Sequence, residues 1–416
     1  MIARSWVLLF AFAALLSGQT KVDEGILLVA EVKRVMAAHL AGAPNYTCLQ
    51  TVERYQQAPG SPTPNLVDVL RLEVAYIAGK ELFAWPGSST FEDEEFREIV
   101  SSGAFGTGDF VLHARSVFLA DGTRFEYRGR EEFAGRPAHR FWFHKPLFSS
   151  GYQITNFERS LRMEVAYHGE FWVDAASKDL LRLWIEAEDI PVVLRVSSAT
   201  DRLDYGLVEL GGRTALLPKE SELRLTDAEG TVNINRTRLT RCKLFQGESN
   251  ILFEDPAQAE NASTAAPERL WLPAGLEVEL ALEADLVHGQ QAVGDEITAR
   301  LRSDLRNGKE VLYPKGSVAK GRIVHLMRHE NPTCLTVALR FTELSSGNRF
   351  SSLNLRHRRT EPNGLPDFSR NNLRGGAMYI EYPEPPALGF VWCKPGVRLG
   401  RGFVTIWETQ NLHDPL

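Results

Sequence analysis

The histidines at positions 325 and 329 come nearest to the spacing of a metal site. They lie four residues apart in the run His-Leu-Met-Arg-His-Glu. A zinc protease motif has glutamate directly after its first histidine and lies on a helix. Here leucine follows His325, in a segment without a helical pattern. Residues four apart on a strand share a face, so a weak site is the alternative. We predict no metal and no other cofactor.

The sequence contains no motif for nucleophilic catalysis. It lacks the Gly-x-Ser-x-Gly turn of serine hydrolases. Gly103, Gly106 and Gly108 suggest a phosphate loop, but the Lys-Ser/Thr pair that binds the phosphate is missing. The acidic residues 92–95 fit the first turn of a helix, where carboxylates complement the helix dipole. We predict no catalytic residue and a protein that is not an enzyme. A hydrolase of unknown substrate is an alternative.

Four cysteines, two in each half of the chain, suit an oxidising compartment. No two of them have the Cys-x-x-Cys spacing of a thiolate metal cluster. An even count in an exported protein indicates disulfides. We predict that Cys48 pairs with Cys242 and that Cys334 pairs with Cys393. Four buried free thiols are the alternative, because cysteine packs as a small apolar residue.

The start of the sequence indicates export. A short basic segment, Met1–Arg4, precedes an apolar run of eleven residues, Trp6–Leu16, and small and polar residues follow. Eleven residues are too few to cross a membrane as a helix. We predict a cleaved signal peptide over residues 1–19. The mature chain is expected to have no transmembrane segment and to be periplasmic or secreted.

Hydrophobic periodicity predicts a first domain over residues 20–254. Apolar residues recur at helical spacing over 24–40, and a helical interruption is expected over 91–119. Elsewhere the period is two, as in Phe141 and Phe143 alternating with Trp142 and His144. Such alternation is typical of an antiparallel sheet with one dry face and one wet face.

A second, smaller domain is expected over residues 270–416. Short alternating strands are separated there by Pro-Gly, Gly-Asp and Asn-Gly turns, which favour a β-barrel or sandwich. Residues 255–269 contain two prolines and no large apolar residue, so we predict a linker. The length of 416 residues suits two or three domains. The net charge of −6 argues against nucleic-acid binding.

Short phrases of the first domain resemble a known superfamily. They are Tyr127-Arg128-Gly129, Gly135-Arg136-Pro137, Phe171–Asp174 and Leu217-Pro218-Lys219. With the opening helix and the long sheet, they resemble the outer-membrane lipoprotein carrier (LolA/LolB-like) superfamily of bacterial envelope half-barrels. The resemblance covers about residues 21–254. It implies an antiparallel half-barrel wrapped on helices that holds an acyl chain or lipid on its apolar face.

The second domain is similar to the C-terminal β-barrel of conjugation and type IV secretion core-complex proteins. The matching phrases are Leu272–Gly275, Gly294-Asp295, Ala299 with Asp304-Leu305, Pro314–Ser317 and Gly321-Arg322. The chain lacks the apolar helical hairpin that would cross a membrane in such a complex. The resemblance implies a barrel that docks a protein partner of the envelope.

These observations predict an exported, non-catalytic envelope protein that binds a lipid or other apolar moiety. A structural component of an envelope or secretion assembly is the alternative. An ordinary core without a cavity is the competing interpretation of the aromatic strands. The side chains expected to line an apolar cavity are Phe83, Trp85, Phe125, Tyr127, Phe141, Phe143, Met163 and Leu183.

Overall fold

The computed structural model describes residues 24–77, 80–88, 91, 112–156, 161–245, 268–330, 333–360, 377–379, 388–392 and 398–411. Most of this part of the chain is β-structure, and it contains two α-helices. The expected signal peptide lies outside the described residues, as does the expected linker up to residue 267.

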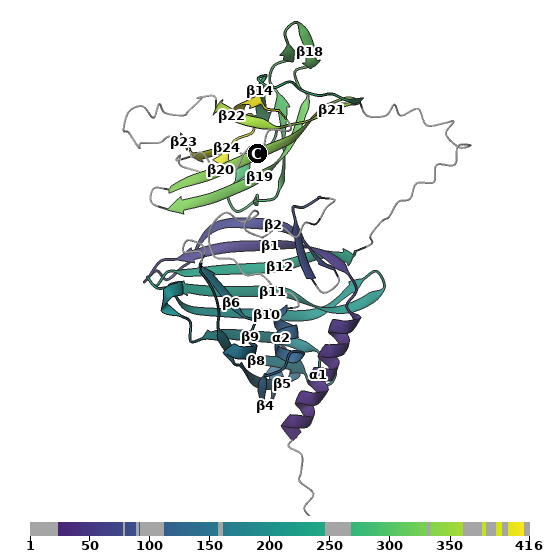
Figure 1. The fold of residues 1–416 in the computed structure, drawn as a ribbon, viewed down its shortest axis with the longest axis vertical. Coiled ribbons are helices and arrows are strands. Elements are labelled where there is room, and N and C mark those ends of the chain that lie inside the picture. The colour runs from purple at the N-terminus through teal and green to yellow at the C-terminus, as the bar shows by residue number, and fades with distance from the viewer. Residues whose placement is uncertain are drawn as a thin grey trace, which may run out of the picture.

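Ten antiparallel strands form the first sheet, which curls into a half-barrel (Figure 1). This confirms the predicted mainly β fold with few helices and a half-barrel sheet. The strands in spatial order are β3 (Lys80–Ala84), β2 (Asn65–Ile77), β1 (Tyr46–Gln57), β12 (Val232–Leu244), β11 (Arg213–Asp227), β10 (Val196–Leu210), β9 (Leu180–Glu188), β8 (Ala166–Asp174), β5 (Arg136–Lys145) and β4 (Arg124–Phe133).

Local sequence explains the hairpins of this sheet. Strands β4 and β5 are joined by Ala134 and Gly135, whose φ angles of 50° and 77° are both positive. Two consecutive positive φ angles give a turn whose twist matches that of the strands, and glycine adopts one at no steric cost. Between β5 and β8 the chain forms a separate two-stranded hairpin, β6 (Gln153–Asn156) and β7 (Leu161–Glu164). Two short 3₁₀ turns, η2 (Leu147–Ser149) and η3 (Val192–Leu194), follow β5 and β9.

Both α-helices pack on the same face of the half-barrel. Helix α1 (Glu24–Gly42) contains the helix expected at 24–40 and buries Val32 and Met36. Helix α2 (Leu112–Phe118) lies within the expected interruption at 91–119, most of which is outside the described residues. Side chains of both helices share one buried cluster with β5, β8, β9 and β10. The apolar side chains that alternate along these strands are therefore buried against the two helices.

The strands after residue 268 form a second sheet of ten strands. Its main path is β13 (Glu268–Arg269), β21 (Arg349–Ser352), β20 (Thr333–Ser346), β19 (Val318–Glu330), β16 (Glu296–Leu301), β14 (Glu277–Leu282), β26 (Val404–Thr409) and β22 (Leu355–Thr360). Strand β24 (Leu388–Trp392) pairs with β20 and with β23 (Ala377–Tyr379). Two separate two-stranded sheets also lie in this part of the chain, β15 (Leu286–Val287) with β25 (Arg398–Leu399) and β17 (Leu305–Asn307) with β18 (Glu310–Tyr313).

The two sheets meet along strand β2. Strand β3 pairs only with residues 73–77 of β2, so the earlier part of that edge is open to another partner. Val293, from the loop between β15 and β16, donates its N–H to Val69 O and accepts from Arg71 N, both at 2.8 Å. An ion pair between Arg71 and Asp295 adds to this contact. The second sheet thereby covers an exposed strand edge, which would otherwise invite aggregation.

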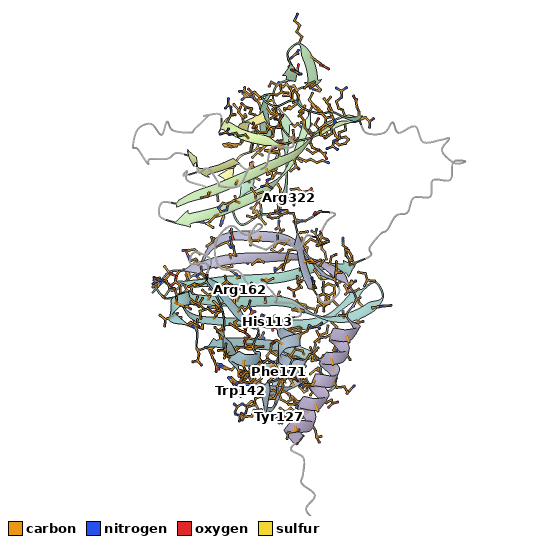
Figure 2. All side chains as sticks on the ribbon, viewed as in Figure 1. His113, Tyr127, Trp142, Arg162, Phe171 and Arg322 are labelled. Atoms are coloured by element: carbon orange, nitrogen blue, oxygen red, sulfur yellow. A yellow bond between two sulfur atoms is a disulfide. The ribbon has the colours of Figure 1, made fainter. Side chains whose placement is uncertain are left out.

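Arg322 of β19 lies where the two sheets meet (Figure 2). Its Nη1 donates to Pro86 O at 3.1 Å and to Gly294 O at 2.6 Å. Its guanidinium also lies 5.6 Å from the ring centroid of Trp85. Apolar contacts continue across the same boundary, because Val52 and Leu70 of the first sheet belong to the buried cluster of the second.

Candidate functional site

An aromatic row crosses the helix-covered face of the half-barrel. The strand register places Tyr127, Phe141, Phe171, Leu183 and Leu203 opposite one another on five adjacent strands. The rings of Phe141 and Phe171 stack with centroids 4.8 Å apart. Offset stacking of this kind stabilises an apolar layer beyond the area that it buries. Tyr127 and Phe171 are labelled in Figure 2.

A second row runs beside the first and depends on a glycine. Phe125 pairs with Phe143, which is opposite Gly169 of β8. A Cβ at Gly169 would lie 2.7 Å from the Phe143 ring and 1.9 Å from Trp184 O. The ring therefore lies directly over the backbone of β8, where any other residue would displace it. Phe143 is fully buried as a result.

The two helices are attached to this face in different ways. Helix α2 inserts Ala114, Val117 and Phe118 into the cluster. The Phe118 ring meets that of Phe171 edge to face at 5.0 Å. Helix α1 spans 19 residues, yet Val32 and Met36 are its only fully buried apolar side chains. Leu28, Val29 and Leu40 of α1 pack against the cluster while partly buried, so α1 buries a smaller fraction of its length than α2 does.

A buried lysine fixes the end of α2. The Lys145 ammonium donates to Ser116 O at 3.1 Å, to Asp121 O at 2.5 Å and to Thr123 Oγ1 at 3.2 Å. It thereby satisfies carbonyl groups at and just beyond the C-terminus of the helix, where a cation is favoured. Loss of hydration on burial lowers the pKa of Lys145.

Two further polar groups lie within the apolar layer. His113 of α2 places Nε2 3.5 Å from Asp201 Oδ2 of β10. Burial lowers the pKa of His113 to about 4, so the imidazole is neutral at pH 7. Tyr167 shares a 2.8 Å hydrogen bond with Ser116 Oγ, and burial raises its pKa to about 12. Sequence patterns gave no sign of His113, because the helix carrying it is short and interrupted.

Polar and cation–π contacts attach α1 near its middle and in its second half. His39 Nε2 is 2.7 Å from Asp179 Oδ1, and both side chains are partly exposed. Lys178 Nζ lies 3.9 Å from Glu31 Oε2. Near the middle of the helix, Lys33 Nζ lies 5.7 Å from the centroid of the Phe125 ring. Exposed or partly exposed ion pairs contribute little to stability, typically up to about 1 kcal/mol.

The structure brings five of the eight predicted cavity residues together. Phe141, Phe143 and Leu183 are buried in the cluster, and Phe125 and Tyr127 pack against it half-buried. The hydroxyl of Tyr127 lies 2.9 Å from His139 Nδ1. These side chains share one cluster with residues of α1 and α2, so the two helices cover this face of the sheet in the described part of the chain.

The other three predicted residues lie elsewhere. Phe83 packs on a separate cluster around Tyr46 and Cys48. Trp85 packs on the core of the second sheet, because β3 lies at the edge that the second sheet covers. Met163 is 36% exposed on β7. The chain breaks between β7 and β8 at Val165, which places Met163 in the β6–β7 hairpin and removes it from the half-barrel face.

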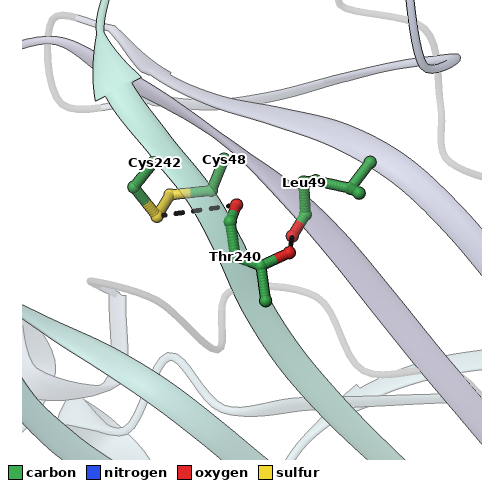
Figure 3. Close-up of a disulfide and its surroundings, with 4 residues drawn as sticks. All are labelled: Cys48, Leu49, Thr240 and Cys242. Carbon is green, nitrogen blue, oxygen red and sulfur yellow. Dashed lines mark hydrogen bonds between the residues drawn. A yellow bond between two sulfur atoms is a disulfide. The ribbon is translucent and has the colours of Figure 1, made fainter.

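The disulfide joins the first strand of the half-barrel to the last. Cys48 of β1 and Cys242 of β12 are bonded, as the sequence predicts (Figure 3). Next to it, Thr240 Oγ1 donates to Leu49 O at 3.4 Å (Figure 3). The bond crosses a bulge in β12, where the register shifts by one residue. Cys393 and the side chain of Cys334 lie outside the described residues, so that pairing stays a prediction.

The described residues contain no group of three or more His, Cys, Asp or Glu side chains placed to hold a metal ion. His325 is buried in β19, whereas the side chain of His329 lies outside the described residues. Within the described part of the chain, no helix combines the length and the apolar character needed to cross a membrane.

Comparisons with known proteins give distant structural matches. No protein-family model and no curated protein matches the chain. A Vibrio parahaemolyticus domain provisionally assigned to outer membrane lipoprotein sorting is 11% identical, with a TM-score of 0.28 over 54% of this chain and 94% of its own. A DUF1329 family protein from Desulfovibrio piger is 10% identical, with a TM-score of 0.28 over 55% and 98%. A LolA superfamily protein from Nitrosomonas europaea is 12% identical, with a TM-score of 0.24 over 55% and 98%.

Proposed function

We propose that this chain is an exported, non-catalytic envelope protein that binds an acyl chain or similar apolar moiety on the aromatic face of the half-barrel. Helix α1 is its movable cover. The observation that carries the proposal is the contrast between this face and its cover. Five of the 14 buried residues in the cluster are aromatic, whereas α1 contributes only two of the 14, Val32 and Met36, and neither is aromatic.

The energetics of exchange favour this arrangement. Moving α1 away would expose Val32 and Met36, each of which stabilises the closed state by about 1.5–3 kcal/mol, and would further expose the partly buried Leu28, Val29 and Leu40. An acyl chain recovers about 0.8 kcal/mol for each buried methylene group. Roughly four to eight methylene groups would therefore offset the loss of both side chains. Ordinary membrane acyl chains are long enough.

The pair between His39 and Asp179 is the contact through which the cover can be tested. It holds the second half of α1 to the turn before β9, and it lies beside the aromatic face without lining it. Removing it weakens the closed state and leaves the binding surface intact. A ligand that binds only the open state then gains affinity in proportion to the open population.

The test uses a fluorescent fatty-acid analogue and the full-length protein. His39→Ala should tighten binding about two- to fivefold, as expected when a pair worth about 0.5–1 kcal/mol is lost. His144→Ala is the matched control, because His144 pairs with Glu188 at 3.1 Å on the opposite, solvent-facing side of the sheet. Its affinity should equal that of the wild type. The proposal fails if the wild type and His39→Ala do not bind at micromolar concentration, or if both variants gain equally.

In the same proposal, the second sheet docks a protein partner of the envelope. Its buried cluster is mainly aliphatic, with three aromatic residues among 25. A filled aliphatic core of this kind suits a scaffold better than a ligand site. Native mass spectrometry of protein purified from its own envelope separates the two roles, since bound lipid and bound protein add very different masses.

A further inference from the structure

Exposed apolar side chains gather at one rim of the half-barrel. Eleven large apolar residues are exposed in the described part of the chain; four of them lie in the turns after β5 and β9, one directly follows α2 and one is on β7. These six, here called the apolar rim, are Leu119, Leu147, Phe148, Met163, Val192 and Val193. Single exposed apolar residues are common, but a cluster of them indicates a binding surface.

Sheet topology explains why these segments meet. Strands β5 and β9 both pair antiparallel with β8, so they run in the same direction and end at the same rim. Turn η2 follows β5, and turn η3 follows β9. Because β8 lies between them, the ends of β5 and β9 are two strand spacings apart, roughly 10 Å. The β6–β7 hairpin carries Met163 and contacts η3.

The turns that carry the apolar rim are held in place by prolines and by buried residues. Each turn begins after a proline, Pro146 or Pro191, whose φ is fixed by its ring. Behind η3, Leu194 is fully buried in a small cluster with Ile154 and Val165. Two residues at the tips of the turns do not take part in this packing, because Phe148 is 86% and Val192 90% exposed.

Leu119 belongs to the same rim because Lys145 joins the end of α2 to the end of β5. Its ammonium bonds to carbonyl oxygens of Ser116 and Asp121, on either side of Leu119. Gly122 is also close to η2, since a Cβ there would lie 3.7 Å from the Phe148 ring. The apolar rim therefore continues from α2 across both turns.

We infer that the apolar rim docks on the surface of a lipid bilayer, with Phe148 and Val192 inserted among the acyl chains. Highly exposed side chains on two separate turns suit shallow insertion of about 5–10 Å into a bilayer. The described charges nearby show no basic excess: Arg195 pairs with Glu229, Arg162 is accompanied by Glu164 on β7, and Asp121 and Asp189 add acidic charge. Without a basic excess, attachment is apolar and does not require anionic lipid.

This inference does not depend on what the aromatic face binds, because none of the rim residues tested lines that face. The experiment is flotation of the full chain with vesicles of phosphatidylcholine. The double variant Phe148→Ser, Val192→Ser should lower the vesicle-bound fraction at least about tenfold. The matched control is Leu207→Ser, Val311→Ser, which removes two exposed apolar residues away from the rim.

The expected result is flotation of the wild type and of the control at both about 0.05 M and about 0.5 M salt. Circular dichroism of both variants should match the wild type, since all four positions are exposed. Failure of the wild type to float, equal flotation of the rim variant, or loss of flotation at high salt each overturns the inference. So does sedimentation of the wild type as a dimer that only the rim substitutions dissociate, because the occupant is then a second copy.

Discussion

The two sheets of this molecule solve the problem of covering an apolar face in different ways. The half-barrel is covered by helices and fills the contact with aromatic rings from β5, β8 and α2. The second sheet buries mainly leucine, valine and isoleucine from its own strands, and its described residues include no helix. A helix that packs on a sheet through its side chains can move away as a unit. Strands that pair with one another cannot separate without losing their hydrogen bonds.

Aromatic content sharpens this difference. Flat rings can shift past one another and still keep favourable edge-to-face or offset contacts. Branched aliphatic side chains are stiff at χ1 and depend on close-packed neighbours. We therefore expect the helix-covered face to adapt to substitution, and the core of the second sheet to resist it.

A matched pair of phenylalanines tests this expectation. Phe143 lies over Gly169 in the first sheet, and Phe341 lies over Gly321 in the second, where a Cβ would approach the rings to 2.7 and 2.8 Å. Both are essentially fully buried. Phe341→Ala should reduce the free energy of unfolding by about 4–5 kcal/mol and Phe143→Ala by about 3, because the helices can partly fill the space. Urea titrations measure both losses, and a larger loss at Phe143 would contradict the comparison.

The cysteines of the second sheet give the next largest effect. Strand register sets Leu335 opposite Trp392, one residue from Cys334 and Cys393 in each strand. We predict a disulfide between them, closing 59 residues (393 − 334) as Cys48–Cys242 closes 194. Replacing both with alanine should cost about 2–4 kcal/mol. Non-reducing peptide mapping identifies the bond, and a free Cys334 in freshly exported protein would refute it.

Local patterns predicted the elements of the first sheet well. The helix at 24–40 and the inward Phe141 and Phe143 follow from periodicity, since a buried face imposes its spacing on the sequence. Trp142, on the other face, is half-buried beneath the guanidinium of Arg128. These positions depend only on near neighbours along the strand.

Contacts between residues that are far apart in the chain could not be predicted from such local patterns. Trp85 has the pattern of a half-barrel strand, yet its environment is set by Arg322 and the second sheet, more than 200 residues later. Met163 alternates correctly with its neighbours, but a break at Val165 moves it into a hairpin. His113 meets Asp201 through the docking of α2, which no spacing in the sequence encodes.

The contact between the two sheets, here called the joint, gives the smallest of these predicted losses in the free energy of unfolding. Arg322 holds two backbone carbonyl oxygens from different parts of the joint, Pro86 O and Gly294 O, and lies on Trp85. Hydrogen bonds to a charged donor contribute about 1.5–3 kcal/mol, and a substitution leaves their acceptors without it. Arg322→Ala should therefore cost about 2–3 kcal/mol. Arg322→Lys should recover only part of this, because an ammonium cannot reproduce the planar fork that contacts two carbonyls and the ring.

The same variant tests whether the two sheets unfold together. Arg306 is the control, since its side chain is half exposed on β17 and pairs with Asp304 far from the joint. In Arg322→Ala, the half-barrel and the second sheet should unfold at different urea concentrations, whereas the wild type and Arg306→Ala should show a single transition. Hydrogen exchange should then be faster at Val293 and Arg71, whose backbone bonds connect the sheets. A single unshifted transition in Arg322→Ala would mean that the Val293 ladder and the apolar contacts of Val52 and Leu70 hold the sheets together without the guanidinium.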